Sequence, residues 1–263
     1  MKKRIISATI MILILIPFII IGGVPFRMLA GIVGILGYKE LIELKGFKNY
    51  PISVIIIGLI VLLMLIFSNR DMLYSIIGLN YKYIVGSYLL MLVPSVILYR
   101  TKKYTTQDAF YLSSFIIYLG LFLNIISNIL IYNKAYFFMI LLATTMTDTF
   151  AYFTGISIGK HKFSKISPNK TIEGCVGGII MGTIITSIYY MTFIGAANVF
   201  EVITATLLLS IACEIGDLFF SAIKREKGIK DFSNLIPGHG GVLDRLDSLS
   251  FVTYTLVLLI GFI

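Results

Sequence analysis

The chain has 263 residues, of which 58% are hydrophobic and only 13% are charged. Soluble domains carry about 25% charged residues, so this composition excludes an ordinary water-soluble domain. Apolar runs of about 20 residues recur along the chain, which is the length that a bilayer-spanning helix requires. These runs are apolar on every side and do not alternate with polar residues, so they predict transmembrane helices and exclude the strands of a barrel.

The first predicted span follows the basic start Met1-Lys2-Lys3-Arg4 and covers about residues 5–22. No small-x-small cleavage site follows it, so we interpret it as an uncleaved span and not as a signal peptide. The expected fold is an all-α integral membrane protein with about nine transmembrane helices. It is a single membrane domain over 1–263, with N-terminal helices over 1–131 and catalytic helices and cytoplasmic loops over 135–263. The other eight spans are predicted at about 25–44, 52–68, 82–99, 108–131, 135–158, 174–195, 199–223 and 248–263.

Basic residues are distributed unequally over the two sides of this arrangement. The side of the N-terminus holds 18 of the 22 lysine and arginine residues, and the other side holds Arg27, Arg70, Lys82 and Lys134. The positive-inside rule therefore places the N-terminus in the cytoplasm and the C-terminus outside the cell membrane. The basic residues behind the net charge of +9 are mostly those that set this topology, so no nucleic-acid partner is expected. On the cytoplasmic face they would attract anionic lipid headgroups and nucleotides.

The two cysteines, Cys175 and Cys213, lie in apolar surroundings and lack the spacing of metal ligands. We interpret both as small packing residues. The chain has only two histidines and neither is near a cysteine, so no ligand set for zinc is present.

Polar residues gather in the two cytoplasmic loops that follow the sixth and eighth spans, at 155–174 and 221–247. Between these loops, Asp148, Glu214 and Asp217 lie within apolar spans. A charge at membrane depth costs about 2.5–3.5 kcal/mol on insertion scales, so such a residue usually faces a cavity or a partner. The sequence therefore predicts a polar site on the cytoplasmic side of the last four spans.

The loop over 221–247 combines the two kinds of group that phosphate chemistry needs. Its cations, with nearby glycines whose backbone can approach a ligand closely, suit a polyphosphate; they are Lys224, Arg225, Lys227 and Lys230. The carboxylates that supply hard oxygen ligands for Mg²⁺ are Asp217, Asp231, Asp244 and Asp247. Together they favour metal-assisted phosphoryl or nucleotidyl transfer to a lipid phosphate.

Each of these features also has a simpler explanation when it is taken alone. Basic loops beside membrane helices commonly set topology, and Asp244 with Arg245 can form a local ion pair that caps the last span. An isolated histidine such as His239 is more often structural than catalytic, and Asp148 can hydrogen-bond within the bundle. Their concentration in one part of the chain favours a site.

The residue order supplies a second line of evidence. The segment 221–247 reads SAIKREKGIKDFSNLIPGHGGVLDRLD and resembles the signature of phosphatidate cytidylyltransferases, also called CDP-diacylglycerol synthases. Two more blocks agree with that family, Asp148-Thr149-x-Ala151-Tyr152-x2-Gly155 and the polar positions of 159–174. The resemblance is strong over 135–263, whereas residues before 131 match only in hydrophobic layout.

The resemblance implies an enzyme, a nucleotidyltransferase of phospholipid biosynthesis. It would convert CTP and phosphatidic acid to CDP-diacylglycerol and pyrophosphate at the cytoplasmic face, with Mg²⁺ as cofactor and a second cation left open. The metal-binding positions map to Asp217 and Asp244, with Asp247 as a further candidate. The remaining partners are the lipid bilayer and, as an open alternative, a second copy in a homodimer.

The same resemblance assigns the remaining site residues. The expected catalytic residues are Asp217, Asp244, Lys224, Arg225, Lys230, Asp231, His239 and Arg245. The expected substrate-binding residues are Lys160, Ser167, Lys170, Thr171, Glu173, Ser221, Gly240, Gly241, Asp148 and Tyr152.

One position departs from the family pattern. An acidic residue commonly precedes the signature serine, and here that position is Phe220. Glu214, an uncommon placement for the family, lies about one and a half helical turns earlier. The sequence leaves open whether Glu214 is a shifted acid or Phe220 marks a nonessential position.

Two alternative functions remain open at this stage. One is a CTP-dependent transferase or kinase that acts on another membrane lipid, because the acceptor pocket consists of generic apolar residues. The other is an ion-coupled secondary transporter that uses Asp148, Glu214 and Asp217 as a relay. No internal repeat supports the transporter, and the polar groups cluster on one side.

Overall fold

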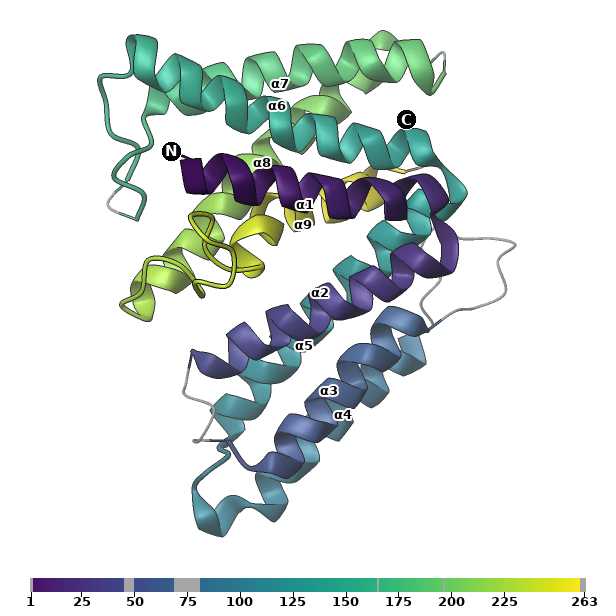
Figure 1. Ribbon diagram of the computed structural model, residues 1–263, viewed down its shortest axis with the longest axis vertical. Coiled ribbons are helices and arrows are strands. Elements are labelled where there is room, and N and C mark those ends of the chain that lie inside the picture. Colours follow the sequence, from purple (N-terminus) through teal and green to yellow (C-terminus); the bar gives the residue numbers. More distant parts are fainter. Residues whose placement is uncertain (1, 45–49, 69–80, 165, 196, 261–263) are drawn as a thin grey trace. The chain divides into compact units, whose positions relative to one another are not determined.

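The computed structural model describes residues 2–44, 50–68, 81–164, 166–195 and 197–260. Within these ranges the chain forms nine α-helices and one short 3₁₀ helix, which confirms the predicted all-α class (Figure 1). The helices are α1 (Lys2–Ile21), α2 (Gly23–Glu43), α3 (Ile52–Phe67), α4 (Tyr81–Ile97), η2 (Tyr99–Thr101), α5 (Thr106–Tyr132), α6 (Lys134–Ile158), α7 (Ile172–Phe193), α8 (Val199–Glu226) and α9 (Leu243–Leu259). Arg70, part of the predicted charge asymmetry, lies outside the described residues.

Four of these helices, α5 to α8, are long and apolar enough to cross a membrane. Three shorter apolar helices lie at 6–21, 52–67 and 81–97. Many large apolar side chains on these helices are exposed, among them Leu89, Ile180 and Phe200. Such a surface is unfavourable in water and suits the hydrocarbon of a bilayer, so the chain is a membrane protein.

The polar segment 221–247 is less of a loop than the sequence predicts. Its first residues continue α8 as far as Glu226, and its last five residues are the beginning of α9, which starts at Leu243 instead of about 248. Asp244 therefore lies in the first turn of a helix. A carboxylate is favourable there because the helix macrodipole places partial positive charge at the N-terminus.

The chain divides into two compact units. The first comprises residues 1–132 and 232–243, and in it α5 packs against α2, α3 and α4. Asn124 of α5 is fully buried and donates to the carbonyl groups of Leu65, Ile66 and Ser68, at 3.0 Å each. These bonds supply partners for carbonyl groups at the C-terminal end of α3, which have no partner within the helix.

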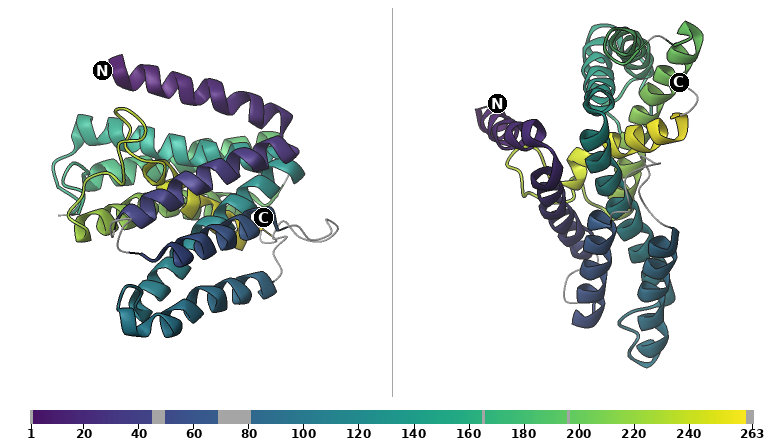
Figure 2. Two further views of the ribbon diagram at one scale, coloured as in Figure 1. Left: turned by 60° about the horizontal axis from the view of Figure 1, so that its bottom comes forward. Right: turned by 90° about the vertical axis from the view of Figure 1, so that its right-hand side faces the viewer.

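The second unit comprises residues 133–231 and 244–263. Here α6, α7 and α8 pack against one another, and Figures 1 and 2 show α6 and α7 running side by side. Gly174, Gly178 and Gly182 repeat every fourth residue on α7 and face α6 so closely that an added Cβ would meet its atoms within 3 Å. Small residues at this spacing let two membrane helices approach.

Candidate active site

A cavity of about 470 Å³ opens in the second unit. Its wall is built by α6, by the turn before α7, by the start of α7, and by α8 and α9. The residues that line it are Asp148, Ala151, Tyr152, Gly155, Ile156, Asn169, Lys170, Thr171, Gly174, Cys175, Asp217, Asp244, Arg245, Asp247 and Ser248. Eight of the predicted site residues are among them, although they come from segments up to about 100 positions apart.

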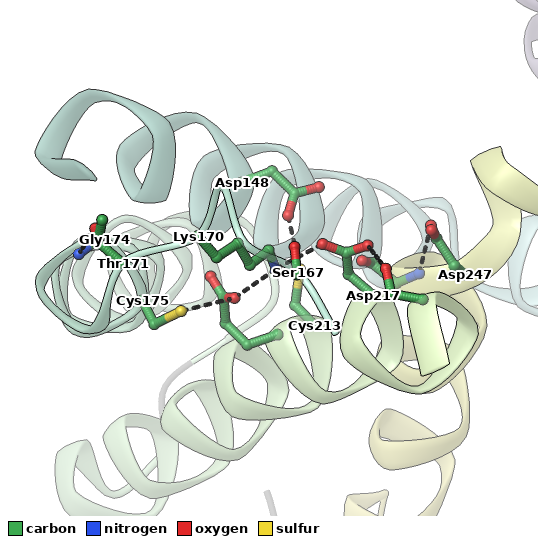
Figure 3. Close-up of polar contacts among 12 residues, drawn as sticks. Asp148, Ser167, Lys170, Thr171, Gly174, Cys175, Cys213, Asp217 and Asp247 are labelled. Atoms are coloured by element: carbon green, nitrogen blue, oxygen red, sulfur yellow. Dashed lines mark hydrogen bonds and ion pairs between the residues drawn. The ribbon is translucent and has the colours of Figure 1, made fainter. Parts of the chain in front are cut away.

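Lys170 is the central cation of this cavity (Figure 3). Its Nζ lies 2.6 Å from Asp217 Oδ2 and 2.8 Å from Glu214 Oε2, and both carboxylates belong to α8. Burial alone would lower the pKa of the Lys170 ammonium, but attraction to Asp217 and Glu214 outweighs it and the pKa is raised. Lys170 therefore remains charged.

The hairpin-like turn before α7 fixes the position of Lys170. Phe163 N donates to Lys170 O and Ile172 N donates to His161 O, both at 2.9 Å. The Glu173 carboxylate accepts from the backbone N–H groups of Lys160 and His161 at 3.1 and 3.2 Å and lies 2.5 Å from His161 Nδ1. Glu173 and Lys160 thus shape the turn, whereas Lys170 at its end reaches the cavity.

A second ion pair lies on the same side of α8. Lys224 Nζ is 2.7 Å from Asp244 Oδ1, and both side chains are buried. Glu214, Asp217, Ser221 and Lys224 are spaced by three, four and three residues, so they share one face of α8. Ser221 Oγ donates to Asp217 Oδ1 at 3.4 Å.

The lining of the cavity contains more carboxylates than basic side chains. Its four carboxylates, Asp148, Asp217, Asp244 and Asp247, are opposed by two basic side chains, Lys170 and Arg245. Figure 3 shows Asp148 on α6 and Asp217 on α8, and Cys213 Sγ of α8 donates to Asp148 Oδ1 at 3.6 Å. A nucleotide triphosphate would be repelled by this wall unless a cation accompanied it.

The carboxylates of the cavity fit a metal ion that substrate and water help to hold. Among the described residues no three His, Cys, Asp or Glu side chains converge closely enough to hold a metal by themselves. Mg²⁺ does not need such a cage, since it is commonly held by one or two carboxylates together with substrate phosphates and water. Asp217 of α8 and Asp244 and Asp247 of α9 line the same cavity, and their hard oxygen donors fit an ion bound in this way.

Several predicted site residues lie in the second unit but do not line the cavity. Arg225 is exposed and donates to the carbonyl groups of Ile166 and Ile229, which ties α8 to the turns around it. Ser167 accepts from Lys170 N at 3.1 Å through its carbonyl group. Lys160, Lys230 and Asp231 are exposed to solvent. Their predicted contacts with substrate remain predictions.

The glycine-rich turn with His239, Gly240 and Gly241 belongs to the first unit. Gly238 and Gly240 have φ of 80° and 81°, a left-handed backbone that favours glycine. Ser7 Oγ donates to Pro237 O at 2.9 Å and lies 2.8 Å from His239 Nδ1. The structure gives His239 a hydrogen-bonded partner from α1.

The sequence interpretation missed Glu40 of α2. Its carboxylate is buried and accepts from Val242 N at 2.8 Å, from Leu243 N at 2.9 Å and from Ser233 Oγ at 2.6 Å. It also explains Gly241, because an added Cβ there would lie 2.5 Å from Glu40 Oε1. No local pattern indicates this role, since the partners are about 200 residues apart.

Phe220, the residue that departs from the family pattern, has apolar surroundings in the structure. Phe220 is 2% exposed, with its ring centroid 5.9 Å from that of Phe219. Glu214 does not line the cavity, but it forms an ion pair with Lys170, which does.

Comparisons with known proteins agree with this picture. Residues 2–263 match the model of the cytidylyltransferase family. Phosphatidate cytidylyltransferase of Bacillus subtilis (strain 168) is 32% identical over 256 residues, which covers 96% of this chain and 94% of the relative. The proteins of the same name from Staphylococcus haemolyticus (strain JCSC1435) and Staphylococcus aureus (strain COL) are 32% and 30% identical, with 96% of each chain covered.

Proposed function

Because the chain belongs to the cytidylyltransferase family, we propose that it transfers the cytidylyl group of CTP to phosphatidic acid. The products are CDP-diacylglycerol and pyrophosphate. The observation that carries the proposal is the cavity of a membrane protein in which Asp217, Asp244 and Lys170 meet. Family membership also decides against the transporter alternative.

The reaction needs no covalent enzyme intermediate, because the phosphate of phosphatidic acid is already a nucleophile. One of its oxygens attacks the α-phosphorus of CTP in line, and the bond to the β-phosphate oxygen breaks as pyrophosphate leaves. Lys170 and Arg245 hold phosphate oxygens at the cavity, which orients the nucleotide for this attack. Buried Lys224 holds Asp244 in place.

We include Mg²⁺ in the proposal, held by Asp217 and Asp244, with Asp247 and a second cation as open additions. When bound, the ion would neutralise charge on the α-phosphate and leaving-group oxygens. The excess of carboxylates on the cavity wall supports this assignment, because these residues would otherwise repel the triphosphate. Asp217 and Asp244 are kept in orientation by Lys170 and Lys224.

The proposed membrane arrangement is nine spans with a cytoplasmic N-terminus and site and an external C-terminus. The nine helices of the described residues and the asymmetric distribution of lysine and arginine support it. CTP is then available on the side where the site opens. Phosphatidic acid would enter from the cytoplasmic leaflet, past exposed apolar residues of the cavity rim such as Ile156.

Two labels on CTP test the reaction and its alternative. Purified protein is incubated with phosphatidic acid, Mg²⁺ and CTP that carries the label either on the α- or on the γ-phosphate. A cytidylyltransferase moves only the α-label into lipid, whereas a CTP-dependent lipid kinase moves only the γ-label. Label that stays in water-soluble products would overturn the proposal, and transfer to an isoprenoid phosphate but not to phosphatidic acid would change the acceptor.

A further inference from the structure

Glu214 is a buried carboxylate for which the reaction described above has no role. It is 4% exposed, and Oε2 accepts from Lys170 Nζ at 2.8 Å and from Cys175 Sγ at 3.4 Å. Oε1 is buried and has no hydrogen-bond partner among the described residues. Burying a carboxylate oxygen without a partner costs free energy, so fold stability alone does not account for a glutamate here.

The hydrogen bonds of the Lys170 ammonium indicate the role of Glu214. An ammonium has three N–H donors, and Glu214 and Asp217 accept two of them, at 2.8 and 2.6 Å. Within the described part of the chain, the third donor remains for a ligand. Lys170 and Asp217 line the cavity, whereas Glu214 is not part of the lining. The lysine is thus held by one carboxylate at the cavity and by another behind it.

Two anchors matter because lysine has a long, flexible stem. Its side chain carries about 2 kcal/mol of rotamer entropy, which is lost when the ammonium is fixed in one place. Asp217 alone cannot fix it for the nucleotide, because Asp217 is itself a proposed metal ligand with its other oxygen bonded to Ser221. Glu214, one helical turn before Asp217, provides an anchor that the ligands do not contact.

We propose that Glu214 is a positioning residue, which holds the Lys170 ammonium at the cavity wall so that its third N–H binds a phosphate oxygen of the nucleotide. This inference rests on the proposed function. It distinguishes Glu214 from the carboxylates of the lining, since Glu214 acts on the substrate only through Lys170.

The first test replaces the charge of Glu214 and keeps its shape. Glu214→Gln removes the negative charge but keeps an oxygen acceptor, so an ion pair becomes a weaker ammonium–amide hydrogen bond, and we expect about a tenfold rise in KM for CTP. The kcat should change less than the KM for CTP, because Lys170 itself is still present, and the KM for phosphatidic acid should stay within about threefold of the parent protein. Glu226→Gln, at the exposed C-terminal end of the same helix, is the matched control and should leave all three unchanged.

The second test measures whether Glu214 acts through Lys170. Lys170→Met leaves the Glu214 carboxylate buried without its cation, and we expect a lower melting temperature of the purified protein. Adding Glu214→Gln to Lys170→Met should raise that melting temperature again. The added change should leave the KM for CTP of the Lys170→Met variant as it is, because the contact is already gone.

The outcomes separate this inference from the proposed function. A parent protein that makes no CDP-diacylglycerol overturns the proposed function itself. An active parent with Glu214→Gln equal to Glu226→Gln overturns only the role of Glu214. A lower kcat and a lower melting temperature with both KM values unchanged would show a merely structural residue. If Glu214→Gln does not fold, the comparison of Lys170→Met with the double variant decides.

Discussion

Asp244 and Lys224 form an ion pair that is almost entirely removed from solvent, with side chains 4% and 9% exposed. Removing one partner of such a pair leaves the other charge buried, which destabilises more than the intact pair stabilises. Asp244 is also a proposed metal ligand. A substitution of Asp244 therefore has two effects, one on stability and one on catalysis, and a double variant can distinguish them.

We expect Asp244→Asn to lower CDP-diacylglycerol synthesis by about 10²–10³-fold, the usual loss when a group that stabilises transition-state charge is removed. Its melting temperature should fall as well, because Lys224 loses its counter-charge. The double variant Lys224→Met with Asp244→Asn should recover the melting temperature while synthesis stays low. Normal synthesis by Asp244→Asn in washed membranes would refute the metal assignment.

Glu40 contributes to the fold through three accepted hydrogen bonds at the start of α9. Glu40→Ala leaves the N–H groups of Val242 and Leu243 buried without an acceptor, and we expect a loss of about 2–4 kcal/mol of stability. Glu43→Ala is the control, since Glu43 is exposed and lies 3.8 Å from its ion-pair partner Lys39. Thermal unfolding in detergent measures both. Equal melting temperatures for the two variants would contradict the role of Glu40.

The helices themselves were predictable because their signal is long and local. A run of apolar residues that is long enough to span a bilayer leaves the backbone no stable alternative to a helix. The start of α9 was not predictable in the same way, because Glu40, about 200 residues earlier, accepts from the N–H groups at its N-terminus. The candidate site followed from the residue order around Asp217 and Asp244, but the role of Glu214 required the three-dimensional position of Lys170.

The close approach of α6 and α7 makes a prediction at the scale of elements. An added Cβ at Gly178 would lie 2.6 Å from Thr147 O and 2.8 Å from Ala151 Cβ. Gly178→Ala therefore forces the two helices apart, and we expect a cost of about 1–3 kcal/mol together with reduced synthesis, because both helices line the cavity. The measurement is melting temperature alongside activity.

The control for this prediction is Gly86→Ala in α4. An added Cβ at Gly86 meets nothing within 4 Å, and alanine is the better helix former, so stability should rise by about 0.5–1 kcal/mol. If both alanine variants shift the melting temperature in the same direction, Gly178 is not needed for the close packing of α6 and α7.

Over the whole molecule, the proposed reaction needs one orientation in the membrane, and the distribution of lysine and arginine predicts the same one. CTP is a cytoplasmic solute that does not cross the bilayer, so the turn with Lys170 must face the cytoplasm. Lys162 lies in that turn, and Lys134 lies at the opposite end of α6; both are exposed. The proposed nine spans place these two lysines on opposite sides of the membrane.

Single cysteines at these two positions test the orientation. Buried Cys175 and Cys213 are first replaced by alanine, and Lys134→Cys or Lys162→Cys is introduced into that background. A membrane-impermeant maleimide applied to intact cells should label the cysteine at 134 and should reach the one at 162 only after the cells are permeabilised. The reverse pattern would place the site outside, where its nucleotide is absent. Labelling of both positions in intact cells would mean that α6 does not cross the membrane.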